Sequence, residues 1–415
     1  MAILLIYFYL SIFYVENMLQ FRLSSIPGLS LFNLSVYLLI FAWTLSILVK
    51  KKLSESSGIN IYIILLISFV IFSIPYQMLF NNELVQNPIA DIIMLKKWLN
   101  PFIIFFCIYN ILNNENTCKK TLYSLNAILL LSALITPLYS IGFLNEHVKF
   151  DFYEGRAAAF AEPNQYAAYL VLFFPMVITH TLFSNKVSSK IINGAILLMA
   201  FIAFITTGSR GGLISLILSI SYYSYSLYRE RAFKFNRLVL LSVALIVFIP
   251  MAFILAPSKA KHTFIERLNP TKSVDANYYT AGRLEHLRLG LHFFIERPFL
   301  GHGISGYSKL WQNRYGSGGS THNQYVDYLV SFGLIGLALY LSIYIKLFKV
   351  TYRYMRSTPL LFDKLLCISY LAGLVGYCFA MLAVNLSPDP RFLFWIYTAA
   401  ILKYFKLKAT APNSA

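Results

Sequence analysis

The chain has 415 residues, of which 58% are hydrophobic and only 13% are charged, and its mean hydropathy is +0.63. This balance excludes an ordinary soluble domain, in which about 25% of residues are charged. Apolar runs long enough to cross a bilayer recur along nearly the whole chain, which predicts an all-α polytopic membrane protein with one integral membrane domain, residues 1–415. The net charge of +18 does not indicate a nucleic-acid partner, because basic residues in membrane proteins mainly set the topology.

The apolar runs predict about twelve membrane-spanning helices. The opening segment MAILLIYFYLSIFY lacks the basic start and the cleavage site of a signal peptide, so we expect it to be a retained first span. Four cysteines within or beside the runs show no metal-ligand spacing and are expected to be reduced packing residues: Cys107, Cys118, Cys367 and Cys378. The predicted spans lie near residues 2–20, 30–49, 59–80, 92–112, 121–143, 162–183, 191–206, 212–228, 238–256, 322–345, 365–384 and 391–405.

Lysine and arginine concentrate in alternate loops between these spans. One set of loops contains dense clusters, for example at residues 50–52, 229–237 and 346–356, whereas the short loops of the other set contain few basic residues. The positive-inside rule therefore assigns the first set of loops, and both termini, to the cytoplasm.

One connection on the opposite side, residues 257–321 between the ninth and tenth predicted spans, is much longer than the others. Long ordered loops are usually functional, and this one is rich in basic residues, which indicates an acidic partner or anionic lipid head groups. Its segment 281–298 has apolar residues at helical spacing and ends at a proline, which predicts an amphipathic helix on or near the membrane surface. The apolar positions are Leu284, Leu287, Leu291 and Phe294.

The stretch TTGSRGG introduces a single charge, Arg210, into an otherwise uncharged apolar region. The predicted topology puts this turn at the outer edge of the membrane, where the eighth helix begins. A guanidinium matches phosphate oxygens, a helix N-terminus favours anions, and the glycines are expected to let backbone N–H groups approach a ligand. The alternative is an arginine that only extends toward the membrane interface.

A histidine, His322, begins the predicted tenth span in STHNQYVDYL. An imidazole titrates near neutral pH and can accept a proton from a hydroxyl, although a histidine at a helix end more often only forms hydrogen bonds. Together with His286, His292 and His302 it lacks a recognised metal-ligand spacing, so no metal site is expected.

The stretch AEPNQY precedes the predicted sixth span. Glu162 or Asn164 is expected to cap that helix, and Pro163 suits its first turn. Arg156, just upstream, is a further candidate for an anion site.

Two absences narrow the choice of function. The sequence contains no P-loop or Rossmann glycine motif, which argues against a nucleotide-driven pump. It also lacks an Asp-X-Asp pair, which metal-assisted use of nucleotide sugars commonly requires.

With TGSRGG, ERPFLGHGISGY and THNQYVDYLVSFGLIGL in this order, the sequence resembles the bacterial O-antigen ligase and polymerase superfamily, most specifically over residues 195–345. The resemblance implies a multi-pass protein of the bacterial inner membrane whose active site faces the periplasm, with residues 257–321 as a periplasmic loop. It also implies transfer of a glycan from undecaprenyl diphosphate to a sugar hydroxyl of lipid A–core, with inversion and without a metal or cofactor. Membrane lipids would be the other partners.

The resemblance also implies roles for individual residues. Arg210 and Arg283 match the arginines that hold the diphosphate, and His322 matches the histidine that activates the acceptor hydroxyl. Possible supporting residues without an assigned role are Arg156, Glu162, Asn164, Gly211 and Arg288. Asp327 has no transferable role.

Three alternatives remain at this level. A polymerase would use the same donor but add the glycan to another lipid-linked repeat, and a protein O-oligosaccharide ligase would add it to a protein. A lipid-linked oligosaccharide flippase is more distant, because it should carry basic residues deep in several spans. Lys96 and Lys97 are the clear candidates for such residues here.

Overall fold

The computed structural model describes residues 2–18, 30–50, 55–80, 88–140, 159, 161–184, 186–231, 253–256, 261–262, 265, 283–316, 319–386 and 391–410. Every regular element among these residues is a helix. In chain order they are α1 (Ala2–Phe13), the π-helix η1 (Tyr14–Met18), α2 (Leu31–Lys50), α3 (Asn60–Phe80), α4 (Pro88–Ile111), α5 (Glu115–Ser140), α6 (Pro163–Phe183), α7 (Val187–Thr207), α8 (Arg210–Arg229), α12 (Arg283–Glu296), α13 (Gly306–Tyr315), α14 (Gln324–Ser357), α15 (Leu361–Ala380) and α16 (Arg391–Thr410).

Among the described residues, 8 helices are long and apolar enough to cross a membrane. They are α2 to α7, α14 and α15. The chain is therefore an all-α, multi-pass membrane protein, as the composition predicts.

The other predicted spans have different outcomes. Helices also form where the first, eighth and twelfth spans are predicted, as α1 with η1, α8 and α16. The ninth, residues 238–256, lies almost entirely outside the described residues. The number of membrane crossings thus stays a prediction.

The predicted tenth span, residues 322–345, is part of a longer helix. Helix α14 begins at Gln324 and continues to Ser357, with a break at Gly333, whose φ is 63° and ψ −166°. The break matters for the site because a loop enters it.

Small residues bring the central helices together. A Cβ atom at Gly373 of α15 would overlap the backbone of Leu172 in α6, and one at Gly376 would lie 2.8 Å from Cβ of Ser219 in α8. The Ser219 hydroxyl also donates a hydrogen bond to the Ala372 carbonyl at 2.9 Å. Close approach of backbones through glycine and serine is a common way for helices to associate in membranes.

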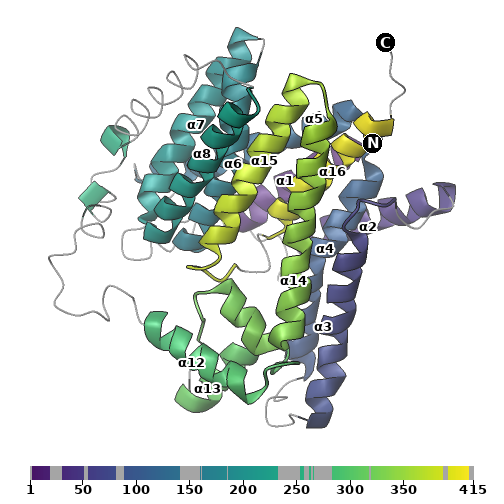
Figure 1. Ribbon diagram of the computed structural model, residues 1–415, viewed down its shortest axis with the longest axis vertical. Helices are drawn as coiled ribbons and strands as arrows, with labels where there is room; N and C mark the ends of the chain where they lie inside the picture. Colours follow the sequence, from purple (N-terminus) through teal and green to yellow (C-terminus); the bar gives the residue numbers. More distant parts are fainter. Residues whose placement is uncertain are drawn as a thin grey trace.

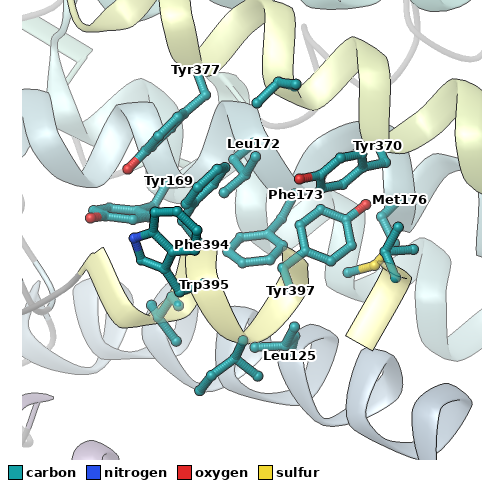
Figure 2. Close-up of a cluster of buried hydrophobic side chains, with 14 of the residues drawn as sticks. Leu125, Tyr169, Leu172, Phe173, Met176, Tyr370, Tyr377, Phe394, Trp395 and Tyr397 are labelled. Carbon is teal, nitrogen blue, oxygen red and sulfur yellow. The ribbon is translucent and has the colours of Figure 1, made fainter. Parts of the chain in front are cut away.

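Aromatic side chains fill the space around this contact. Figure 2 shows residues of α5, α6, α15 and α16 meeting in one buried cluster. Tyr377 stacks on Phe394 with ring centroids 5.1 Å apart, and Phe173 lies 5.3 Å from Tyr397. At the start of α8, Gly211 lies against Ala383, just after α15, and Gly212 lies against Ala167, near the start of α6. The first residues of α6 and α8 therefore lie at the same end of the bundle as the last residues of α15.

Two short helices, α12 and α13, lie at one end of the bundle, away from the labelled chain termini (Figure 1). Charged residues on the side assigned to the cytoplasm form ion pairs with one another. Arg356 lies 3.0 Å from Glu230, and Lys403 lies 2.8 Å from Glu55.

Candidate functional site

The TTGSRGG stretch forms a tight turn between α7 and α8. Gly208 has a φ of 56°, the left-handed conformation that often ends a helix, and α7 ends at the preceding Thr207. Ser209 is the N-cap of α8, and its hydroxyl oxygen accepts a hydrogen bond from the Gly212 N–H at 3.1 Å. Arg210 is therefore the first residue of α8, at the positive end of the helix dipole.

The glycines of this turn let α8 pack closely against its neighbours. A Cβ atom at Gly211 would lie 2.7 Å from Cβ of Ala383, and one at Gly212 would lie 2.8 Å from Cβ of Ala167 in α6. The Gly212 N–H is already bonded to Ser209. The expectation that the glycines bring N–H groups to a ligand is thus wrong for Gly212, since its place is set by the cap and by helix packing.

Helix α12 carries Arg283 in its first turn and packs against α14. Gly290 is the point of closest approach, since a Cβ atom there would lie 2.5 Å from Cγ1 of Val326. Phe293 is buried beside it, with its ring 5.9 Å from that of Tyr307 in α13. This contact fixes the position of Arg283 relative to α14.

The apolar stripe predicted for this helix forms only part of that contact, through the half-buried Leu287 and Phe294. Leu284 is 66% exposed and Leu291 is 42% exposed, while Gly290 and Phe293 are the buried positions. The packing face lies to one side of the stripe, because glycine at position 290 permits an approach that sequence periodicity does not reveal. Contact of the stripe with the membrane surface stays a prediction.

The segment that follows α12 enters the break in α14. The His302 N–H donates to the Val330 carbonyl at 2.8 Å, and the amide of Gln77 in α3 donates to the His302 carbonyl. A Cβ atom at Gly333 would overlap the Phe299 carbonyl. The stretch ERPFLGHGISGY thus holds α12 and α13 against α3 and α14.

The THNQY stretch forms the start of α14. Asn323 is the N-cap, and its side-chain oxygen accepts hydrogen bonds from the N–H groups of Tyr325 at 3.0 Å and Val326 at 3.2 Å. His322, just before the cap, has a φ of 49°. A residue other than glycine adopts this left-handed conformation only when its surroundings hold it there. Here the Ser320 hydroxyl accepts a hydrogen bond from the His322 N–H at 3.3 Å.

Arg210, Arg283 and His322 line one pocket of about 340 Å³. They come from the start of α8, the start of α12 and the residue before the cap of α14. The other lining residues are Leu284, Leu287, Thr321, Asn323 and Leu382. The structure therefore brings together the three residues to which sequence analysis gives roles.

The surroundings of His322 keep its imidazole neutral at pH 7. Burial lowers the pKa of His322 below its usual value of 6.5. The nearby Glu162 raises this pKa, whereas Arg283 and His286 lower it. A neutral imidazole is the form that can accept a proton.

A second histidine, His286, lies against His322. In the sequence it stands out only as one of four histidines without metal-ligand spacing. The two ring centroids are 5.6 Å apart, and Nδ1 of His286 is 2.8 Å from the Tyr307 hydroxyl. Burial lowers the pKa of His286 and raises that of Tyr307. The spacing of His286 three residues after Arg283 on one helix is a signal that could have drawn attention to it.

The other two histidines have separate partners. Nε2 of His302 is hydrogen-bonded to the Phe293 carbonyl at 2.8 Å. His292 lies 3.7 Å from the Glu296 carboxylate.

Glu162 occupies the N-cap position of α6, as one of the two capping alternatives predicts, and Pro163 begins the helix. Its carboxylate makes no capping hydrogen bond and instead accepts one from the Asn164 side-chain amide at 3.2 Å. The capping interpretation is thus correct for the position of Glu162 and wrong for its bonding. The carboxylate acts on His322 instead.

Arg288, another supporting candidate, does not line the pocket. Arg288 is exposed on α12, and Arg156 lies outside the described residues. Asp327, in the first turn of α14, interacts with Asn385 and Arg391.

Two basic residues of the long loop have partners within the protein. Lys309 of α13 lies 2.7 Å from the Asp91 carboxylate in α4, and Arg297 donates a hydrogen bond to the Phe80 carbonyl at 2.9 Å. An acidic partner is therefore not needed to explain these two residues.

Hydrogen bonds next to the pocket connect residues that the sequence did not single out. The Asn385 amide donates to the Ser320 hydroxyl, the same oxygen that accepts the His322 N–H, at 3.3 Å. The Gln324 side-chain oxygen accepts a hydrogen bond from Arg391 at 3.2 Å. Arg391 has a weaker signal than Arg210, because it directly precedes the apolar run FLFWIY but has Asp389 two residues before it.

Residues 195–341 match the family described as O-antigen ligase. This part of the chain is therefore similar to the O-antigen ligase family. It contains Arg210, Arg283 and His322, and the resemblance predicted from the sequence motifs is confirmed. The O-antigen ligase family comprises membrane ligases and polymerases of the glycosyltransferase type.

A curated relative matches more distantly. The chain is 28% identical over 226 residues to an uncharacterized protein of Haemophilus influenzae. The match covers 50% of this chain and 54% of the relative, so the chain spans about half the length of the relative it matches.

Proposed function

We propose that the chain is a glycosyltransferase that moves a glycan from undecaprenyl diphosphate to a sugar hydroxyl of lipid A–core. The observation that carries this proposal is the pocket in which Arg210, Arg283 and His322 meet. The O-antigen ligase family match over the same part of the chain supports the general class of reaction.

The two arginines suit the diphosphate. When the bond between the anomeric carbon and the diphosphate oxygen breaks, the electron pair and the negative charge go to that oxygen. Arg210 and Arg283 can stabilise this charge with charge-assisted hydrogen bonds, and the N-terminus of α8 adds its dipole. In the proposed reaction this charge stabilisation requires no metal ion or other cofactor.

His322 suits the acceptor. Its neutral imidazole accepts the proton of the sugar hydroxyl as that oxygen attacks the anomeric carbon. Attack opposite the leaving diphosphate inverts the configuration at that carbon.

An apolar groove beside the pocket suits a lipid-linked donor. The groove lies between α14 and α15, has a volume of about 690 Å³ and is lined mainly by leucine and aromatic residues. Leu382 lines both the groove and the pocket. A diphosphate bound to the arginines would therefore have apolar surface next to it for its hydrocarbon chain.

The proposed setting is the bacterial inner membrane, with the pocket at the periplasmic face and both termini in the cytoplasm. The clusters of lysine and arginine in alternate loops support this orientation.

A polymerase that adds the same donor to another lipid-linked repeat remains the nearest alternative, because the pocket chemistry is the same. A flippase is less well supported. Lys96, one of its candidate residues, lies 3.2 Å from the Tyr37 hydroxyl in α2 and does not line the pocket.

The test uses purified protein, undecaprenyl-diphosphate-linked glycan and EDTA, with either lipid A–core or a second lipid-linked repeat as acceptor. Glycan on lipid A–core indicates a ligase, and a ladder on the lipid carrier indicates a polymerase. Transfer to neither acceptor would contradict both.

The arginine role is tested with Arg210→Ala and a matched control, Arg288→Ala. We expect Arg210→Ala to reduce turnover by about 10²–10³-fold, as for other losses of one oxyanion-stabilising donor. Arg288 is exposed and outside the pocket, so its variant should keep normal turnover. Full activity of Arg210→Ala would exclude a diphosphate role for this residue.

A further inference from the structure

The exposed end of α13 has the side chains of a carbohydrate-binding surface. It reads WQNRY, residues 311–315, with two aromatic rings and three planar polar side chains in one and a half turns. Gln312, Asn313 and Arg314 are exposed, and Tyr315 is 46% exposed. Sugar rings stack their C–H faces on aromatic rings, and planar amides and guanidinium groups bond their hydroxyls.

Ring contacts connect this surface to the pocket. Tyr315 lies 4.4 Å from Trp311, and Trp311 lies 4.3 Å from His286, measured between ring centroids. His286 in turn lies 5.6 Å from His322. The exposed tyrosine is therefore the outer end of a continuous row of rings that ends at the proposed base.

This row reaches His322 from a different side than the arginines. His286 is three residues after Arg283, which turns it by about 60° around α12. Arg283, Leu284 and Leu287 line the pocket, whereas His286 does not. His322 thus belongs both to the pocket and to the row of rings.

The surface is held in place. Lys309, on the second turn of α13, lies 2.7 Å from Asp91 of α4. A Cβ atom at Gly306, the first residue of α13, would lie 2.9 Å from Cβ of His302, in the segment that enters the break in α14. Gly319 lies against the Trp311 ring, where an added Cβ atom would overlap it. Tyr315 is therefore the more exposed of the two rings.

We propose that residues 311–315 are the subsite for the acceptor glycan. A sugar ring of this glycan stacks on Tyr315, and the rest of the glycan brings its reactive hydroxyl to His322. The inference rests on the proposed function for the presence of an acceptor. It adds which surface binds that acceptor and which chemistry, aromatic stacking with amide hydrogen bonds, recognises it.

The first test measures binding without donor, so that it does not depend on turnover. Saturation-transfer NMR is recorded on the purified protein with two soluble probes, the core oligosaccharide released from lipid A and one free glycan repeat. We expect transfer to the ring protons of one probe, with about tenfold weaker binding in Tyr315→Leu, which keeps an apolar side chain against Trp311. Tyr315→Phe, which keeps the ring, should bind as the wild type does.

Phe299→Ala is the matched control, because Phe299 is 65% exposed on the same outer segment and is not part of the row. It should not change binding. Equal binding by Tyr315→Leu and wild type, equal losses in Tyr315→Leu and Phe299→Ala, or no binding of either probe would overturn the proposal.

Turnover then separates this inference from the proposed function. In Tyr315→Leu the KM for the acceptor should rise about tenfold, while kcat and the KM for the donor stay unchanged. An unchanged acceptor KM would overturn the subsite and leave the proposed function intact. Absence of transfer by the wild type would instead contradict the function.

Discussion

His322 combines a strained backbone with a neutral side chain. Its left-handed φ of 49° is held by the Ser320 hydroxyl on one side and by the N-cap Asn323 on the other. Burial and the neighbouring cation of Arg283 keep its pKa low. Both properties suit the proposed role of His322 as a proton acceptor beside Arg210 and Arg283.

The left-handed backbone at His322 makes asparagine the better substitution for testing the proposed role as a base. Asparagine tolerates the left-handed conformation better than alanine, so His322→Asn removes the imidazole with less effect on the backbone. We expect turnover to fall by about 10²–10⁴-fold while donor binding persists. Single-turnover rates and donor binding measure the two effects. His292→Asn, a change at an exposed histidine outside the pocket, should be neutral, and normal turnover of His322→Asn would exclude the base role.

The pH dependence of turnover should depend on the charge of the Glu162 carboxylate. Turnover requires neutral His322, so it should fall with decreasing pH only below the usual imidazole pKa of 6.5, because the His322 pKa is lowered. Glu162 raises this pKa, so Glu162→Gln should move the acid limb of kcat to still lower pH. A limb that stays in place, or moves to higher pH, would show that Glu162 does not act on the proposed base.

At the scale of elements, the break in α14 organises the site. The chain that enters it carries α12 and α13 on either side, and these helices provide Arg283 and the row of rings. Gly333 permits this entry because it lacks a side chain at the point where the Phe299 carbonyl passes.

Gly333→Ala should therefore destabilise the protein by two effects. The positive φ costs about 1–3 kcal/mol for a residue with a side chain, and the added methyl group would overlap the Phe299 carbonyl. Gly316→Ala is the matched control, since Gly316 has a φ of 73° and open space around it. Thermal unfolding should show a larger loss for Gly333→Ala. Equal losses would mean that strain alone, without insertion of the loop, accounts for the glycine.

At the scale of the whole molecule, the ion pair between Lys309 and Asp91 joins α13 to the membrane bundle through α4. The side chains are only 19% and 9% exposed, so the charges are poorly screened. In a double-mutant cycle with Asp91→Ala and Lys309→Ala, unfolding measurements should give a coupling free energy of about 0.5–3 kcal/mol. Purely additive effects would mean that the pair does not hold α13 in place.

Much of the architecture follows from local sequence. Apolar length predicts the helices, the distribution of lysine and arginine predicts their direction, and the polar residues before the sixth apolar run predict the start of α6 at Glu162. Glu162 is a partial exception, because its position at a helix start does not reveal that its carboxylate interacts with a distant histidine.

The sequence by itself determined the membrane class and the resemblance to the O-antigen ligase family, which pointed to the three pocket residues, because hydrophobic length and short motifs are properties of neighbouring positions. Only the tertiary structure decided that Arg210, Arg283 and His322 line one pocket, that His286 lies against His322, and that Gly211 and Gly212 pack closely against neighbouring residues. These contacts join residues far apart in the chain. They depend on which helices pack together and how closely, and a single glycine at position 290 or 333 changes that without altering the periodicity.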